Sequence, residues 1–249
     1  MSTPAFRDMS PALRGPWFHW LRGVLAGAVL AVLAGCATGP GAHPADPLEP
    51  FNRSVASFND KVDDAVLRPA ASAYRRVLPN MVRTGVNNFF SNLSDVWSFA
   101  NSVLQLNLRY STDNFLRVNI NTIFGLGGLL DIATEASIDR HPEDFGQTLG
   151  RWGMPSGPYL VLPLLGPSTV RDGAALLVDR QGDLLSSIND IPWRNSMYVL
   201  RVIDARSRFL RASELLDEAA LDKYSFTRDA YLQRRRNEVH NGELPDDGN

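Results

Sequence analysis

The stretch FNRSVASFNDKVDDAV, residues 51–66, carries the pattern that decides the fold. Its apolar side chains recur at steps of three and four residues, the spacing that places side chains on one face of an α-helix. They are Phe51, Val55, Phe58, Val62 and Val66. Proline disfavours the helical conformation of the residue before it, so we expect this amphipathic helix to stop before Arg68-Pro69.

Similar stripes follow along the chain and predict a series of short helices. A second helix is expected to begin near Pro69, and Pro79 stands at a first-turn position that can open a third. Ser94-Asp95 is expected to cap a fourth helix, because short polar side chains bond the free N–H groups of a first helical turn. The first half of the chain therefore reads as helices joined by brief breaks.

The helical pattern continues into the C-terminal half. Ser111 or Thr112 is expected to cap a fifth helix that ends at the glycines of residues 124–128. The later helices are predicted over residues 144–152, after a cap at Ser168, over residues 196–216, and from Ser225 or Thr227 to Val239. Because no long alternation of apolar and polar residues indicates a large sheet, the fold class is mostly α, with one domain over residues 46–240.

Prolines and glycines interrupt the helical pattern between residues 153 and 168. Met154-Pro155-Ser156-Gly157 is a turn signal, and an apolar run follows it at residues 159–165. Prolines in and around the run exclude a regular helix. The run is predicted to form either a small hairpin or an extended segment across the fold.

The N-terminus has the three-part layout of a secretory signal. Arg14 and Arg22 precede an apolar run at residues 24–33, and small residues then lead to Cys36. The run is too short to span a bilayer as a helix, and no later segment approaches 18 consecutive apolar residues. We therefore expect residues 1–35 to be a cleaved signal peptide and the mature chain to contain no transmembrane helix.

Cys36 is the only cysteine of the chain, so it cannot form an intramolecular disulfide. The tetrapeptide Leu33-Ala34-Gly35-Cys36 resembles the lipobox of bacterial lipoproteins, in which the cysteine is acylated and becomes the first mature residue. Ala37 in place of aspartate implies, by the same resemblance, passage to the outer membrane. We expect a covalent lipid on Cys36, rather than a buried free thiol, followed by a flexible tether over residues 36–45, with a disordered tail over residues 241–249.

The charge of the chain argues against nucleic acid as a partner. The sequence has 25 basic and 27 acidic side chains, which gives a formal net charge of −2. Proteins that bind nucleic acid carry a clear excess of basic residues, at least on one face. We therefore expect no nucleic-acid partner.

The residue patterns that catalysis needs are missing from the sequence. The only histidine inside the domain is His141, and His141-Pro142-Glu143-Asp144 lacks the ligand spacing of a metal site, so it is interpreted as a solvent-facing turn. The glycines at 125, 127 and 128 are interpreted as a helix end rather than a phosphate-binding loop. The segment 153–157 has its serine one place too late for a hydrolase nucleophile elbow. We expect no enzyme activity, no metal and no cofactor apart from the lipid on Cys36.

Several motifs, in order and with similar spacing, resemble the VacJ family, also called the MlaA family. The first is Asp46-Pro47-Leu48-Glu49-Pro50-Phe51-Asn52-Arg53, in which family members often have glycine in place of Pro50. The others are Phe58-Asn59, residues 118–122 (VNINT), 125–131 (GLGGLLD), 144–150 (DFGQTLG), 157–159 (GPY), 162–163 with 166–168, and Arg171-Asp172. The resemblance spans about residues 46–240.

The resemblance implies a flat ring of amphipathic helices with a central channel, embedded in the inner leaflet of the outer membrane. Its implied function is to remove mislocalised phospholipids from the outer leaflet and to pass them to a soluble periplasmic carrier, and from there to an inner-membrane ABC complex. This activity maintains lipid asymmetry. A trimeric outer-membrane porin is the implied neighbour, and no covalent chemistry is implied.

Within this picture, polar side chains should face water or lipid headgroups, because polar groups facing hydrocarbon are costly. The candidates for channel or headgroup contact are Asn52, Arg53, Asn59, Asn119 and Arg171, and a role in helix caps or internal ion pairs is the alternative for each. Gly153, Met154, Pro155, Ser156 and Gly157, with the apolar run after them, are the candidates for a mobile gating turn at the channel mouth.

Two other functions stay open at this point. The chain can be a structural or assembly lipoprotein that docks porins and moves no lipid, since apolar helix faces also serve protein contacts. A lipase is the third reading, and the missing nucleophile elbow counts against it.

Overall fold

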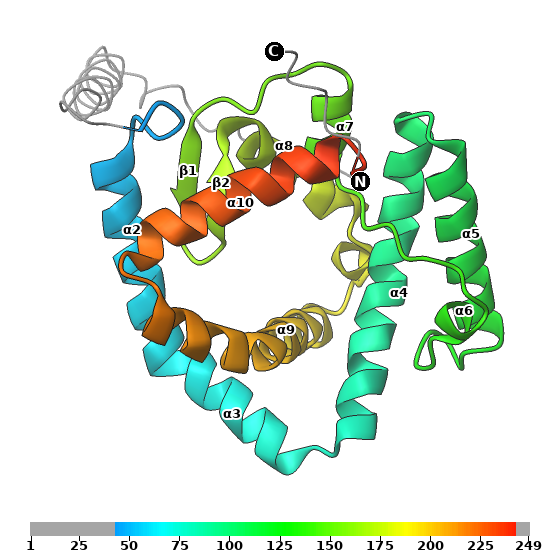
Figure 1. The fold of residues 1–249 in the computed structure, drawn as a ribbon. Coiled ribbons are helices and arrows are strands. Elements are labelled where there is room, and N and C mark those ends of the chain that lie inside the picture. Colours follow the sequence, from blue (N-terminus) through cyan, green and yellow to red (C-terminus); the bar gives the residue numbers. More distant parts are fainter. Residues whose placement is uncertain (1–42, 243–249) are drawn as a thin grey trace, which may run out of the picture.

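The computed structural model describes residues 43–242, and its helices follow one another around a ring (Figure 1). Helices α2 (Glu49–Val62) and α3 (Arg68–Val77) form one side, and α4 (Asn80–Leu104) returns along the opposite side. The C-terminal helices α9 (Ile191–Ala219) and α10 (Lys223–Val239) complete the circuit, with α9 packed on α3. The predicted signal peptide, Cys36 and the residues after 242 lie outside the described part of the chain.

The remaining elements sit on and within this ring. They are the π-helical turn η1 (Asp63–Leu67), α5 (Leu108–Ile123), α6 (Ile132–Glu135), α7 (Phe145–Arg151), the strands β1 (Tyr159–Leu162) and β2 (Gly166–Thr169), α8 (Val170–Gly182) and the 3-10 turn η2 (Leu184–Ser187). Helix α5 packs along α4 on the outside of the ring (Figure 1), and α7 packs on α8. The prediction of a mostly α fold in one ring is confirmed.

The joint between α2 and α3 is a widened helical turn rather than a break. The predicted end before Arg68 is wrong, because η1 carries the helix onward and the Arg68 N–H bonds the Asp63 carbonyl five residues back. Pro69 has no N–H, and its ring would collide with the carbonyl of Ala65 in a regular helix. A π-turn accommodates this collision without ending the helix.

The predicted boundary at Ser94-Asp95 is also wrong, since both residues lie inside the 25-residue helix α4. The Ser94 hydroxyl donates to the Phe90 carbonyl, and buried Asp95 accepts from Arg140 Nε at 2.7 Å. A short polar residue caps a helix when its side chain bonds the free N–H groups of the first helical turn. Here other partners satisfy the two side chains, so the helix continues through them.

Two further caps lie close to, but not at, the predicted residues. Asn107 caps α5 by accepting from the Tyr110 N–H, while Ser111 and Thr112 lie within the helix. Thr169, and not Ser168, caps α8. The long helices begin earlier than predicted because aspartates precede them: Asp190 caps α9 and Asp222 caps α10.

The irregular segments match the predictions more closely. Asp144 caps the start of α7, and Gly153, just after the end of this helix, has φ +93°. The chain leaves α5 through Gly127 and Gly128, both at positive φ, as predicted for a helix end. The apolar run forms a hairpin in which β1 pairs antiparallel with β2, with Tyr159 opposite Thr169 and Leu162 opposite Gly166. The hairpin packs against α2 and α8.

Buried side chains in the described residues are more often polar than apolar. Arg117 is fully buried and bonds Asp131 at 2.8 and 2.9 Å, while Asn121 donates to the same carboxylate. Burying a charge is costly unless a partner compensates it. The interior therefore depends on the pairing of polar groups more than on an apolar core.

Arg235 joins the last helix to the rest of the ring. Its guanidinium bonds Asp144, the cap of α7, at 2.6 and 2.7 Å and Asp172 in the first turn of α8 at 2.9 Å. Burial would raise the pKa of Asp172, but hydrogen bonds from Arg235 hold it below its usual value. Because Arg235 is itself buried, these contacts fix α10 to α7 and α8.

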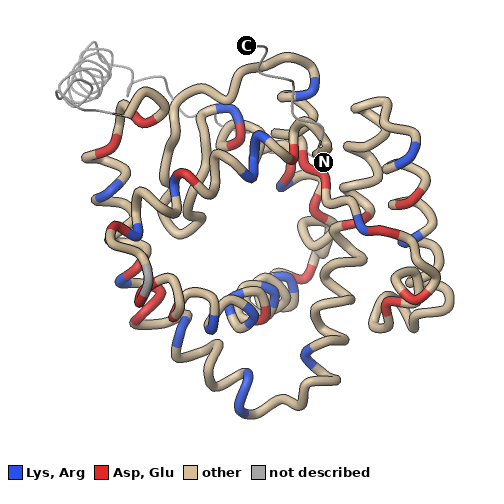
Figure 2. Tube along the Cα trace, in the orientation of Figure 1, with Lys and Arg blue, Asp and Glu red and all other residues tan. Residues whose placement is uncertain are grey.

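Large apolar side chains gather on the outside instead. Leu106, in the turn between α4 and α5, and Leu108, at the start of α5, are more than four-fifths exposed. Phe124 and Leu126, beyond the end of α5, are about two-thirds exposed. Figure 2 shows that α4 carries few charges, whereas α9 and α10 carry many. So many large exposed apolar side chains indicate contact with another protein or with lipid. None of the helices within residues 43–242 is long and apolar enough to cross a membrane.

The contact between α4 and α8 generates a stability prediction. Gly182 ends α8 against the indole of Trp97, whose Nε1 donates to Asp179 at 2.8 Å, and an added Cβ at Gly182 would overlap the ring. Gly182→Ala should therefore lower the free energy of unfolding by about 1–3 kcal/mol. Urea unfolding of the detergent-solubilised protein, followed by circular dichroism, measures this change.

Gly173→Ala in the same helix is the matched control. A Cβ at Gly173 would lie 3.6 Å from Ser168 Oγ and 3.8 Å from Leu162 Cδ1, which is ordinary contact. Alanine is the better helix former by up to about 1 kcal/mol, so this variant should be neutral or stabilised. Equal destabilisation by both substitutions would contradict the packing assigned to Gly182.

Candidate functional site

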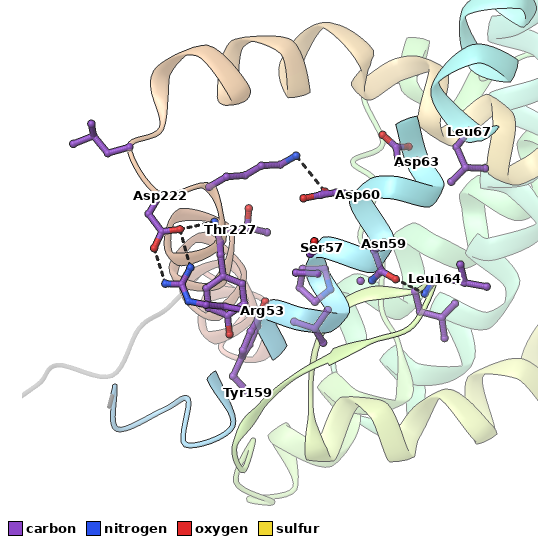
Figure 3. A pocket seen from close by; sticks show the side chains of 18 residues that line it. Arg53, Ser57, Asn59, Asp60, Asp63, Leu67, Tyr159, Leu164, Asp222 and Thr227 are labelled. Carbon is purple, nitrogen blue, oxygen red and sulfur yellow. Dashed lines mark hydrogen bonds and ion pairs between the residues drawn. The ribbon is translucent and has the colours of Figure 1, made fainter. Parts of the chain in front are cut away.

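A cavity of about 550 Å³ opens between the hairpin, the first helix and the start of the last helix (Figure 3). One wall comes from α2 and η1, a second from β1, β2 and their turn, and a third from residues 221–227. Its size is within the range of about 300–1,000 Å³ that small-ligand sites have. Among the described residues, this cavity best combines charged groups with an apolar wall.

Arg53 forms the charged side of the cavity nearest α10. Its guanidinium bonds Asp222 at 2.6 and 3.1 Å and Glu49 at 2.8 Å, and it lies over the ring of Tyr224, 4.4 Å from the ring centre. The hydrogen bonds to Asp222 raise the pKa of Arg53, and the same contact lowers the pKa of Asp222. Both groups therefore stay charged at every physiological pH.

Lys223, the residue after Asp222, supplies a second cation to the cavity. Its ammonium lies 3.2 Å from Asp60 on α2 and 2.9 Å from Asp217 on α9. Burial would lower the pKa of Lys223, but the hydrogen bonds to Asp217 and Asp60 raise it above its usual value. The cavity thus holds two cations, each beside an acid that also lines it.

The opposite wall of the cavity is apolar. Leu164 and Leu165 form the turn of the hairpin and are about two-thirds exposed, and Leu67 adds to this wall from η1. Charged groups and apolar side chains therefore face one space, an arrangement suited to a molecule with a charged end and an apolar end.

Asn59 fixes the turn of the hairpin. Its amide nitrogen donates to the Leu162 carbonyl at 2.9 Å, and its oxygen accepts from the Leu164 N–H at 2.8 Å (Figure 3). Leu164 has φ +65°, a left-handed conformation that is unfavourable for a residue with a Cβ. The two bonds from Asn59 help to hold this strained turn beside the cavity.

Asn52 holds the base of the same hairpin and does not line the cavity. It is fully buried, donates to the Tyr159 carbonyl at 3.0 Å and to Asp46 at 2.8 Å, and accepts from the Val161 N–H at 2.9 Å. Asp46, also fully buried, accepts the Tyr224 hydroxyl as well. Asn52 thus joins the start of the domain to β1.

The remaining polar candidates lie elsewhere. Asn119 is on α5, where its amide donates to the Phe115 carbonyl of its own helix. Arg171 is buried in α8, pairs with Asp172 at 2.9 Å and donates to the Met154 carbonyl at 3.3 Å. Of the five polar candidates, Arg53 and Asn59 line the cavity described above, whereas Asn119 and Arg171, like Asn52, do not.

The candidate gating turn lies between α7 and β1. Gly153, Met154, Pro155 and Ser156 line a second cavity of about 380 Å³, together with Arg171 and Arg235. Gly153 and Gly157 have φ values of +93° and +67°, in the region that favours glycine. A Cβ at Gly157 would approach Val170 Cβ to 3.3 Å, whereas one at Gly153 would meet open space.

His141 is placed differently from the prediction of a solvent-facing turn. Its ring stacks on Tyr110 with 3.7 Å between ring centres, and its Nε2 lies 3.0 Å from Asp113 Oδ2. The side chain is mostly buried, because helix α5 offers both an aromatic face and an acid. No group of three His, Cys, Asp or Glu side chains within residues 43–242 is arranged to hold a metal.

Sequence reasoning missed four charged residues of the cavity: Asp60, Asp63, Asp222 and Lys223. A signal was present for one of them, because Asp222 stands three residues before Ser225 at a helix start and is the cap of α10. Nothing in the local sequence indicated that α2 and α10 meet, since 169 residues separate Arg53 from Asp222.

The fold and the cavity define a class of protein: a ring of amphipathic helices with many buried polar groups, many exposed apolar side chains and a charged cavity beside a short hairpin. The chain belongs to the MlaA lipoprotein family, whose model matches residues 44–238. The family resemblance of the sequence motifs is thereby confirmed.

Individual relatives agree with this assignment. The proteins named "Intermembrane phospholipid transport system lipoprotein MlaA" from Shigella flexneri and Escherichia coli (strain K12) are each 36% identical over 219 residues, covering 86% of this chain and 86% of theirs. The Haemophilus influenzae protein of that name is 35% identical, covering 80% of this chain and 81% of its own. A solved structure from work on the "Structural basis for maintenance of bacterial outer membrane lipid asymmetry" is 36% identical with a TM-score of 0.69, covering 78% of this chain and 98% of that chain.

The role of Asn59 generates a prediction about the hairpin. Asn59→Leu keeps the size of the side chain but removes both bonds to the turn, so the strained turn should open more readily. We expect amide hydrogen exchange at Leu164 and Leu165 to rise about 5–30-fold, as a loss of about 1–2 kcal/mol implies. Asn119→Leu, which removes an asparagine bonded only within α5, should leave exchange in the hairpin unchanged; a rise in both variants would contradict the assignment.

Proposed function

We propose that this chain is an outer-membrane lipoprotein that takes mislocalised phospholipid out of the outer leaflet and passes it to a soluble periplasmic carrier. The single observation that carries the proposal is the inverted distribution of polarity, with paired polar and charged groups buried between the helices and large apolar side chains exposed. The names of the relatives, which are phospholipid transport lipoproteins, support the same conclusion.

The outer surface suits a position within one leaflet. Leu106, Leu108, Phe124 and Leu126 together offer an apolar surface that lipid tails can cover. Covering such a surface with hydrocarbon is favourable by about 25 cal/mol for each Å² removed from water. The ring then lies in the inner leaflet with its polar interior as a passage, and the lipid on Cys36 delivers the chain to this membrane.

The interior suits the passage of a headgroup. A phospholipid crossing a membrane must carry its charged headgroup past hydrocarbon, which is costly. Charged side chains in the cavity, such as Arg53 and Lys223, lower this cost, while Leu164 and Leu165 accept the acyl chains. Movement of lipid through a central channel needs no bond to be made or broken, so the proposal includes no covalent chemistry.

The partners follow from the direction of transport. A soluble periplasmic carrier must receive the lipid at the periplasmic face, and an inner-membrane ABC complex must take it from the carrier. A trimeric porin beside the ring would pack against the apolar side chains of α4 and α5 that residues 43–242 leave exposed. Asn52, through its bonds to Tyr159 and Val161, is then proposed to hold one wall of the passage in place.

Deletion of the gene tests the proposal. Phospholipid in the outer leaflet should rise, together with sensitivity to detergent, and the wild-type gene should restore both. The purified protein in bilayers should release intact phospholipid to a carrier. Intact asymmetry with failed porin assembly would instead favour a porin-docking lipoprotein that moves no lipid, and hydrolysed lipid would favour a lipase.

The gating turn supplies a second test. Gly153→Val and Gly157→Val place a branched side chain at positive φ, so the turn should become strained and its movement restricted. We expect either variant to complement the deletion only partly, with surface phospholipid above the wild-type level at equal protein abundance. Unchanged surface phospholipid in both variants would count against a gate at this turn.

A further inference from the structure

The charged side of the cavity holds two cation–acid pairs of the same kind side by side. Arg53 is paired with Asp222, and Lys223 is paired with Asp60. Figure 3 shows Arg53 with Asp222 on one side of Ser57 and Asp60 on the other, so that both pairs border one space. The cavity therefore presents positive and negative charge at two neighbouring points.

These pairs differ in their exposure from the most deeply buried ion pairs of the described residues. The side chains of Arg53 and Asp222 are 42% and 43% exposed, and those of Lys223 and Asp60 are 39% and 52% exposed. By contrast, Arg117 and Asp95 are almost completely buried. An exposed ion pair contributes little free energy, so each of its partners can turn toward a ligand of opposite charge at a small cost in free energy. A buried pair cannot, because separating it leaves buried charges without a partner.

We propose that this cavity recognises a zwitterionic phospholipid headgroup that carries a phosphate and a primary ammonium. Arg53 and Lys223 contact the phosphate, and Asp60 and Asp222 accept hydrogen bonds from the ammonium. The proposal rests on the proposed function and deepens it, because it names the lipid class that the passage prefers.

The balance of charge in the cavity argues for a zwitterion over an anionic lipid. The cavity is lined by two basic and three acidic side chains, the third acid being Asp63, which Arg206 of α9 binds at 2.6 and 2.7 Å. An anionic headgroup such as that of phosphatidylglycerol would pair with the two cations. It would give Asp60 and Asp222 no cation to bind and would place its negative phosphate close to them. A zwitterionic headgroup matches both signs.

The acceptor chemistry argues for a primary over a quaternary ammonium. Carboxylates, with the hydroxyls of Ser57 and Thr227 nearby, can accept the N–H groups that a primary ammonium offers and a quaternary one lacks. Quaternary ammonium groups are bound instead by open aromatic faces. The Tyr224 face is covered by Arg53, 4.4 Å from the ring centre.

The lipidated full-length protein tests this preference directly. It is incubated with vesicles of equal phosphatidylethanolamine and phosphatidylglycerol, separated from them, and its bound lipid is quantified by mass spectrometry. We expect phosphatidylethanolamine to be enriched about fivefold, which corresponds to about 1 kcal/mol. When phosphatidylcholine replaces phosphatidylethanolamine, the enrichment should disappear; equal enrichment of phosphatidylcholine would overturn the assignment of a primary ammonium.

Asp60→Asn is the diagnostic variant and Asp64→Asn its matched control. Both remove one acid from the same continuous helix, but Asp64 pairs with Arg68 and does not line the cavity. Lys223 keeps Asp217 at 2.9 Å in the Asp60 variant. Asp60→Asn should bring the enrichment close to one, and Asp60→Glu should retain it. Asp64→Asn should behave as the wild type both in enrichment and in total bound lipid.

The outcomes separate this proposal from the proposed function. Bound lipid without enrichment in the wild type, or equal enrichment in the Asp60→Asn and Asp64→Asn variants, would overturn headgroup selection at this cavity while leaving lipid transport in place. A wild-type protein that takes up no lipid from either vesicle would overturn both.

Discussion

The ring is held closed by buried charges that must find partners, and Arg235 is the clearest case. Its guanidinium joins the last helix to the cap of α7 through Asp144 and to the first turn of α8 through Asp172. Removing one partner from a buried pair leaves an uncompensated charge, which costs about 3–5 kcal/mol. A fold with an apolar core tolerates small shifts between helices, whereas these contacts fix the angle and distance of α10. The cavity beside α2 keeps its shape because α10 is fixed in this way.

Polarity inside and apolar surface outside are two sides of the same arrangement. Since many paired polar groups occupy the interior, large apolar side chains of helices such as α5 are left for the surroundings, as Leu108 and Ile123 illustrate. The same pattern that predicts a buried core in a water-soluble protein therefore serves an outer surface here. The hairpin is the exception, because its Tyr159 and Val161 are buried while Leu164 and Leu165 at its turn reach the cavity.

Local signals in the sequence predicted the class of fold, the family and, as one of two alternatives, the hairpin, but not the joints. The step from η1 to α3 was misread because Pro69 normally ends a helix, and a π-turn is not visible in the spacing of apolar residues. Ser94 and Asp95 were misread as a cap because their partners, Phe90 and Arg140, depend on tertiary structure. For the site, Arg53 and Asn59 were found through the family motifs, whereas Asp60 and Lys223 gain their meaning only where α2 meets α10. The spacing of apolar residues along the sequence cannot predict contacts between distant segments.

The pairs that close the ring have a kinetic consequence. Arg53 and Asp222 are 169 residues apart, and Arg228 lies 182 residues after Asp46, so the first and last parts of the domain must meet before either pair can form. Contacts of such long range form slowly and only when the whole domain is present. Until then, the apolar surfaces of α4 and α5 face water without the closed ring that orients them, which exposes the chain to aggregation. A chain of this topology therefore has a vulnerable interval between its synthesis and its arrival at a membrane, during which a chaperone that covers apolar surface would be of most use.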